Sequence, residues 1–190
     1  VKMLGTLEPA GEPLQALLSR RPCLAYRLTR TPIGHKSGAP KVRQRGVRSR
    51  LVDPTGALDV ELEGAEWTKT GNAVADSLME KAQSAMGDLA HIDADIEFPP
   101  THRARFEADG GTGGPWPDGV ALPGAEHLDE LRTRDFPDPD PNDRNRVAHY
   151  EEDLLRPGDT VEVTGMIRER DGKLVLGAPP NLAMRVRPAR

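Results

Sequence analysis

The side chains of this 190-residue chain that could carry chemistry are five histidines, one cysteine and thirty acidic residues. The histidines are His35, His91, His102, His127 and His149. None of them has the His-Glu-x-x-His spacing of a catalytic zinc site. A single cysteine also leaves no Cys-x-x-Cys pair for a structural zinc site. We therefore expect no metal and no cofactor.

Two glycine-rich or acidic stretches imitate ligand-binding loops. Residues 138–142 begin like a calcium loop, but Asp143 stands where that loop needs Gly, and His149 stands where it needs Glu. Residues 110–114 are rich in glycine, yet no Lys-Ser/Thr pair follows them, so a phosphate-binding loop is not expected. Neither stretch predicts a site.

An enzyme would have to assemble its groups from distant segments. The alternative that stays open is a hydrolase-like enzyme in which clustered carboxylates and either His149 or His102 converge in a cleft. Cys23 is not a candidate nucleophile, because it begins an alternating stretch, residues 23–30, that predicts a half-buried strand. The expectation that follows is a chain without catalysis.

Basic side chains gather in residues 41–50, which predict one strand with a basic stripe. The candidate binding residues in it are Arg43, Arg45, Arg48 and Arg50. They suit phosphate or an anionic membrane surface. No aromatic residue lies in this stretch, and single-stranded nucleic acid is usually bound by stacking, so a nucleic-acid partner is not expected.

The net charge of −4 hides a strong asymmetry along the chain. Residues 1–52 hold 11 Lys/Arg against 2 Asp/Glu, residues 53–160 hold 9 against 25, and residues 161–190 hold 6 against 3. Two basic ends and an acidic middle fit a fold in which the two ends pair in one sheet and the middle covers it. The alternative is a basic face for phosphate, lipid head groups or an acidic partner.

The elements that must position these residues are organised around residues 147–167. Val147, Tyr150 and Leu154 recur with helical spacing, so we expect a helix that ends before Pro157 and turns at Gly158. After Gly158 the apolar residues recur at every second position, which is the pattern of a strand. One face of this predicted strand contains Val161, Val163, Gly165 and Ile167.

Local signals predict several further elements. Gly165 indicates a bend or a close backbone approach in its strand, as in a small barrel. Residues 51–62 predict a hairpin that turns at Asp53 to Gly56, and residues 168–176 predict another with Asp-Gly at its tip. First and last strands are expected over residues 2–8 and 182–186. Residues 72–89 have the pattern of an amphipathic helix.

Three separated stretches resemble one known family, the GIDE-type proteins. Residues 13–27 are similar to their P-L-x-A-P-x-S-x-x-P-C-x-x-Y segment. Residues 51–60 resemble their D-x-T-G-x-x-x-V hairpin, and residues 150–165 resemble their E-x-x-L-x-x-G-D-x-V-x-V-x-G segment, with Gly158, Asp159 and Gly165 at matched positions. The resemblance covers roughly residues 5–66 and 147–188, and residues 67–146 lie outside it.

The resemblance implies a "beside a membrane" domain, named after a mitochondrial outer-membrane ubiquitin ligase in which it lies between two transmembrane helices. The ligase activity there belongs to a RING finger of cysteines and histidines, so it does not carry over to a chain with one cysteine. The matched positions are turn and strand residues, and no catalytic residue transfers. The chain begins with Val1, and we expect it to be a soluble, membrane-associated piece of a longer, anchored prokaryotic protein.

Together these observations predict a mainly β fold: a small curled sheet or OB-like barrel with two or three covering helices. We expect one domain, residues 1–190, in which residues 67–146 are inserted between strands of the same sheet. Its structural turns are expected at Gly56, Pro157, Gly158, Asp159 and Gly165. The predicted function is non-catalytic binding of a protein partner or a small ligand, as a sensor or adaptor.

Overall fold

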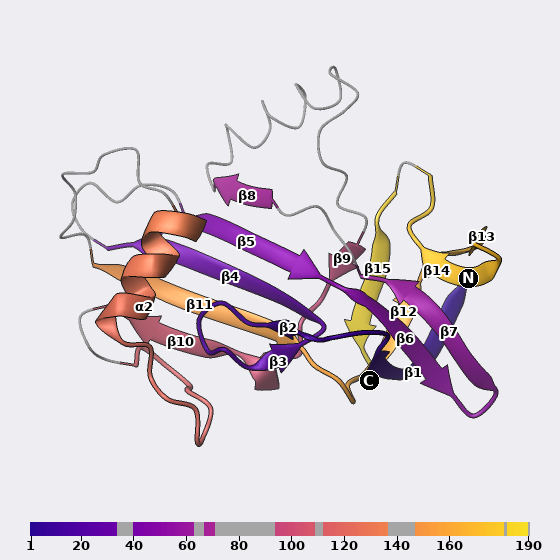
Figure 1. Ribbon diagram of the computed structural model, residues 1–190, viewed down its shortest axis with the longest axis horizontal. Coiled ribbons are helices and arrows are strands. Elements are labelled where there is room, and N and C mark those ends of the chain that lie inside the picture. The colour runs from indigo at the N-terminus through magenta and orange to yellow at the C-terminus, as the bar shows by residue number, and fades with distance from the viewer. Residues whose placement is uncertain are drawn as a thin grey trace, which may run out of the picture.

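The computed structural model describes residues 1–33, 40–62, 67–70, 94–108, 112–136, 147–180 and 182–189. Within them the chain is mainly β, as predicted, and forms two large sheets and one short ribbon (Figure 1). The predicted helix over residues 72–89 lies outside the described residues. So do His35, His91 and the segments 110–111 and 138–142.

The larger sheet has eight strands in the order β13-β14-β7-β6-β1-β12-β15-β9. Its strands are β1 (Lys2–Pro9), β6 (Arg48–Asp53), β7 (Gly56–Glu61), β9 (Ala94–Ile96), β12 (Thr160–Thr164), β13 (Met166–Arg170), β14 (Lys173–Gly177) and β15 (Met184–Pro188). Strands β14–β7 and β15–β9 pair in parallel, and the other neighbours pair antiparallel.

The smaller sheet has five antiparallel strands in the order β10-β11-β4-β5-β8. Its strands are β4 (Ala25–Pro32), β5 (Lys41–Gly46), β8 (Trp67–Thr70), β10 (Ala104–Glu107) and β11 (Ala148–Leu155). A two-stranded ribbon, β2 (Leu14–Gln15) with β3 (Pro22–Cys23), lies beside it. The described helices are short: η1 (Pro100–His102), α2 (Ala125–Glu130) and the π-helical turn η2 (Leu131–Asp135).

The expectation that the basic ends of the chain pair with each other is confirmed. β1 pairs with β12. β4 pairs with β11 over eight residue pairs and β14 pairs with β7, but β11 and β7 belong to the acidic segment 53–160. The middle of the chain contributes strands to the sheets as well, because β9 closes one edge of the eight-stranded sheet and β8 and β10 form both edges of the five-stranded sheet. The middle of the chain, which was expected to cover the sheet, therefore also forms edge strands of both sheets.

The predicted helix through Tyr150 and Leu154 is wrong, because these residues belong to β11. Tyr150 and Leu154 are buried, and their even spacing of four residues also places them on one face of a strand. The decisive feature is that β11 has a partner on each side, β4 and β10. A central strand satisfies all its backbone groups through these neighbours, and this outweighs a three-residue helical pattern.

The larger sheet curls, but the described strands do not close into the predicted OB-like barrel. Gly165 alone connects β12 to β13, although these two strands are separated by four others in the sheet order. A Cβ atom at Gly165 would lie 2.6 Å from the Gly177 carbonyl oxygen, so the predicted close backbone approach is confirmed. Only glycine lets the backbones come this near.

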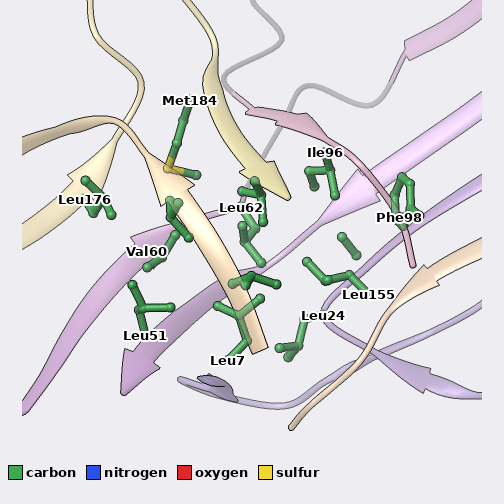
Figure 2. Close-up of a cluster of buried hydrophobic side chains, with 14 of the residues drawn as sticks. Leu7, Leu24, Leu51, Val60, Leu62, Ile96, Phe98, Leu155, Leu176 and Met184 are labelled. Carbon is green, nitrogen blue, oxygen red and sulfur yellow. The ribbon is translucent and has the colours of Figure 1, made fainter. Parts of the chain in front are cut away.

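The main core lies where the two sheets meet (Figure 2). Leu7 and Val60 come from the eight-stranded sheet, whereas Leu24 and Leu155 come from the β3–β4 and β11 end of the five-stranded sheet. The Leu24 N–H donates to the Leu155 carbonyl, and the Val47 N–H donates to the Leu24 carbonyl. These contacts join the sheets through one cluster of buried side chains.

A second core lies between the five-stranded sheet and the helical segment that crosses it (Figure 1). Leu28, Phe106 and Tyr150 come from the sheet, and Leu131 and Phe136 come from η2 and the residue after it. A further contact joins this core to the 16–21 loop, the connection between β2 and β3, through Leu18. The loop and α2 are thereby held on the same face of the sheet.

Candidate functional site

The 16–21 loop is fixed to the sheet by one buried carboxylate, Glu152 of β11. Its side chain accepts hydrogen bonds from the Leu18 N–H at 2.6 Å, from the Ser19 N–H at 3.1 Å and from the Ser19 hydroxyl. Glu152 is fully buried, and its strand neighbours point the opposite way because side chains alternate along a strand. The contact joins residues 133 positions apart in sequence.

Burial raises the pKa of Glu152, while the hydrogen bonds from Ser19 and Leu18 and the charge of Arg21 oppose that shift. Burial also raises the pKa of the nearby Cys23 thiol to about 12, and Glu152 adds to the effect. Cys23 is therefore protonated at neutral pH. The prediction that it is a buried structural residue rather than a nucleophile agrees with its complete burial.

Arg21 extends the contact to a second turn of the chain. Its Nε donates to Ser19 Oγ at 3.2 Å, and its Nη2 donates to the His102 carbonyl at 2.8 Å. The His102 ring in turn contacts Asp159, with 2.8 Å between Nε2 and Oδ1. We call Ser19, Arg21, His102, Glu152 and Asp159 the motif junction, because their contacts join the 16–21 loop to β11, to the segment before β10 and to the turn after β11.

Beside the motif junction lies an open hollow of about 600 Å³ between the 16–21 loop and α2. Ligand-binding pockets commonly have this size. Its apolar wall contains Leu18, Leu122 and Pro123, and its polar groups come from Ser19, Arg20, Glu126, His127 and Glu130. Leu122 is half exposed, whereas Leu18 is fully buried.

His127 connects the two walls of the hollow. Its Nδ1 lies 3.0 Å from Arg20 Nη2, and its Nε2 lies 2.8 Å from the Leu17 carbonyl oxygen. A guanidinium nitrogen can only donate, so Nδ1 must be the acceptor and the ring proton is on Nε2. The contacts thus require a neutral imidazole that orients the Arg20 side chain.

The pairing of Ser19 with Glu152 has the appearance of a nucleophile beside a base. Acyl transfer also needs N–H donors that stabilise an oxyanion. The two nearest amides, those of Leu18 and Ser19, already donate to Glu152. The geometry therefore suits a structural tie between the loop and the sheet better than a catalytic pair.

The single basic strand expected over residues 41–50 is divided in two. β5 carries Arg43 and Arg45 in the smaller sheet, whereas β6 carries Arg48 and Arg50 in the larger sheet. The division falls at Gly46, where a Cβ atom would overlap the Leu62 carbonyl. The chain must bend there, and the predicted continuous stripe does not form.

The arginines of this stretch differ in their surroundings. Arg43 donates to the Asp135 carbonyl at 2.6 Å, and Arg48 forms an ion pair with Asp59 at 2.7 Å. Arg50 donates to a backbone carbonyl, and Arg45 is exposed. Binding of phosphate or anionic lipid by this group stays a prediction.

The two histidines proposed for a hydrolase-like cleft lie at opposite ends of β10. His102 lies two residues before the strand and contacts Asp159, while His149 is paired in register with Glu107 at its far end. The His149 Nδ1 lies 3.7 Å from Glu107 Oε1. Among the described residues, no three His, Cys, Asp or Glu side chains are grouped as metal ligands would be.

Turns are present at Gly56 and around Pro157 and Gly158, whereas Gly165 lies between β12 and β13 and is not a turn. Gly56 has a φ of +153° and its N–H donates to the Asp53 side chain, which closes the β6–β7 hairpin. Gly158 has a φ of +90° after Pro157, and the Asp159 side chain accepts from the Arg156 N–H. The Gly158 N–H and the Asp159 carbonyl also bond to Leu7, so this turn ties β11 and β12 to the first strand.

The residues of the hollow and of its supporting contact were not singled out from the sequence. Arg20, His127 and Ser19 belong to irregular segments whose positions depend on tertiary contacts. Glu152 could have been found, because it lies in a run of three acidic residues within a buried stretch, where alternation directs at least one acid inward. A buried acid needs donors, and loop amides are the usual source.

Comparison with family models, with curated proteins and with solved structures found no match to this chain. Among the helices of the described residues, none has the length and apolar character needed to cross a membrane.

Proposed function

We propose that this chain is a non-catalytic binding domain, a sensor or adaptor within a membrane-anchored protein that resembles the GIDE-type family. Ubiquitin-ligase activity is not part of the proposal, because a RING finger needs more cysteines than the one present. The ligand or protein partner would occupy the hollow between the 16–21 loop and α2.

One observation carries this proposal: the contact of Ser19 with Glu152. These two residues belong to different family-like segments, and together they fix the loop that forms one wall of the hollow. Buried polar groups that satisfy each other's hydrogen bonds stabilise the position of the segments that carry them. A rigid wall with an open surface beside it suits recognition, because preorganisation lowers the entropy lost on binding.

Site-specific photo-crosslinking in the full-length protein tests the binding part of the proposal. A benzophenone amino acid at Leu122, inside the hollow, should give a saturable crosslink with a ligand or partner from the native membrane fraction. The matched control is Leu174 on the β13–β14 hairpin, which is also exposed and lies outside the hollow. Equal crosslinking at both positions, or turnover of a substrate by the isolated chain, would contradict the proposal.

Cell fractionation tests the membrane part. The full-length protein should sediment with membranes and resist extraction by carbonate, because an anchor of about 20 apolar residues binds effectively irreversibly. Recovery of all the protein in the soluble fraction would remove this part and leave the crosslinking result unaffected.

A further inference from the structure

Arg20 adopts a backbone conformation that arginine normally avoids. Its φ is +55°, in the left-handed region. The other described non-glycine residue with positive φ is Asp171, whose Asp-Gly hairpin turn explains it. The Cβ atom makes this region unfavourable for arginine, and glycine would avoid most of that cost. Such outliers concentrate at functional sites.

The Arg20 side chain is also positioned rather than loose. One of its nitrogens donates to the neutral His127, whose other nitrogen donates to the Leu17 carbonyl. A guanidinium has five N–H donors in a planar fork, so the single contact with His127 leaves donors for a carboxylate or phosphate. Arg20 is exposed and lines the hollow, where such a group could reach it.

The acidic side chains of the hollow are not equivalent. Glu130 is paired with Arg134 at 3.0 Å, so its charge is compensated within the helical segment. Glu126 has no ion pair with any residue in the described part of the chain. The hollow therefore presents one available cation, Arg20, and one available anion, Glu126, with Leu122 and Pro123 in the same lining.

We infer that the hollow binds a zwitterionic ligand with an apolar body: an anionic group on Arg20, a cationic group on Glu126 and the apolar body against Leu122 and Pro123. This inference rests on the proposed binding function and specifies its ligand. A free apolar amino acid and a peptide segment with a basic and an acidic side chain share this chemistry. They differ in the separation of the two charges.

Two probe series test the inference by calorimetry and by amide NMR shifts of the hollow residues at pH 7. The first compares free leucine with N-acetyl-leucine and leucinamide, which each keep one charge. The second compares the blocked peptide acetyl-Lys-Leu-Glu-amide with its Gln-Leu-Glu and Lys-Leu-Gln analogues. In at least one of the two series, the doubly charged probe should bind about tenfold more tightly than either singly charged analogue, because each analogue loses one charge-assisted hydrogen bond.

Variants separate recognition from folding. Arg20→Asn and Arg20→Gly suit the left-handed backbone, so Tm should be unchanged or higher, while the preference for the probe's anionic group is lost. Arg20→Lys keeps the charge and should retain part of the preference. Glu126→Gln should remove the preference for the cationic group only. The 15N shifts of His127 should report the Nε2–H tautomer in the free protein.

The inference is overturned if neither series binds, if singly and doubly charged probes bind equally, or if Arg20→Asn binds as the parent does. Success in the leucine series alone indicates a small-molecule ligand, and success in the peptide series alone indicates a partner segment. A specific crosslink at Leu122 together with failure of both series would retain the binding function and reject the zwitterionic ligand.

Discussion

At the scale of single residues, the position of the 16–21 loop depends on a few buried polar groups that bond to one another. Glu152 accepts from three donors of the 16–21 loop, and Arg21 contacts both that loop and the His102 carbonyl. A buried carboxylate without such donors would be strongly unfavourable. The contact therefore specifies one position of the loop, which in turn determines where Arg20 lies.

Glu152→Gln should destabilise the fold. The variant places an NH2 group against loop N–H donors and leaves at least one of them without an acceptor, which costs roughly 1–3 kcal/mol for each unsatisfied donor. The free energy of unfolding in urea measures the effect. The control is Glu151→Gln, whose carboxylate is partly exposed and pairs with Arg105, and which should change stability by less than about 1 kcal/mol. Equal effects of the two variants would contradict the structural role of Glu152.

Cys23 should be unreactive in the folded protein. Its thiol is fully buried and its pKa is raised to about 12, so little thiolate exists at pH 8 and no reagent reaches it. A thiol reagent should label it only after denaturation, and labelling of the native Ser19→Ala variant should be faster, because the loop beside Cys23 has lost a bond to Glu152. Rapid labelling of the native parent protein would show that the loop is open.

At the scale of elements, the sequence correctly predicted the hairpin turns. Asp53 to Gly56 and Asp171-Gly172 each connect two antiparallel strands, as predicted. A turn depends on the φ values that two to four adjacent residues can adopt, so its signal is local. The wrong prediction concerns β11, whose apolar spacing fits both a helix and a strand. Pairing with its two neighbouring strands, β4 and β10, makes it a strand.

Gly46→Ala should destabilise the protein, because the added Cβ would overlap the Leu62 carbonyl at the bend between β5 and β6. Relief of this overlap requires a backbone shift, for which about 1–3 kcal/mol is typical. Gly11→Ala is a matched control, since nothing lies within 4 Å of a Cβ there. Thermal or urea unfolding compares the two variants, and similar stabilities would mean that the close approach at Gly46 is absent.

At the scale of the whole molecule, strands from both ends of the chain form one framework, and residues 67–107 add strands at the edges of the sheets. The Leu24, Leu155 and Val47 contacts join the two sheets, so neither sheet has a separate core at the junction. Elements that share a core unfold together. The hollow lies on this framework, which supports recognition by a preorganised surface.

Native-state hydrogen exchange should report a single cooperative unit. The slowest amides of β1, which lies between β6 and β12, and of β4, which lies between β5 and β11, should exchange with the same free energy of opening. Amides of the edge strand β13 should exchange faster, because that strand is paired on one side only within the described residues. Clearly different values for β1 and β4 would indicate two sheets that unfold separately.

The candidate site was only partly predictable. The sequence placed the hairpin turns correctly but treated residues 41–50 as one binding strand. Along a single strand, Arg43 and Arg45 already point to the opposite face from Arg48 and Arg50, since the spacing between the pairs is odd. The bend at Gly46 then separates them into two sheets. The hollow could not be predicted, because Arg20 and His127 meet across 107 positions of sequence.

The sequence by itself determined that the chain is mainly β and where its hairpins turn, because these depend on residue type and local spacing. Only the tertiary structure decided that residues 148–155 form a central strand and that Glu152 binds the 16–21 loop. It also brought Arg20 and Glu126 into one hollow. Each of these depends on free energy gained between residues far apart in the chain, which no local pattern records.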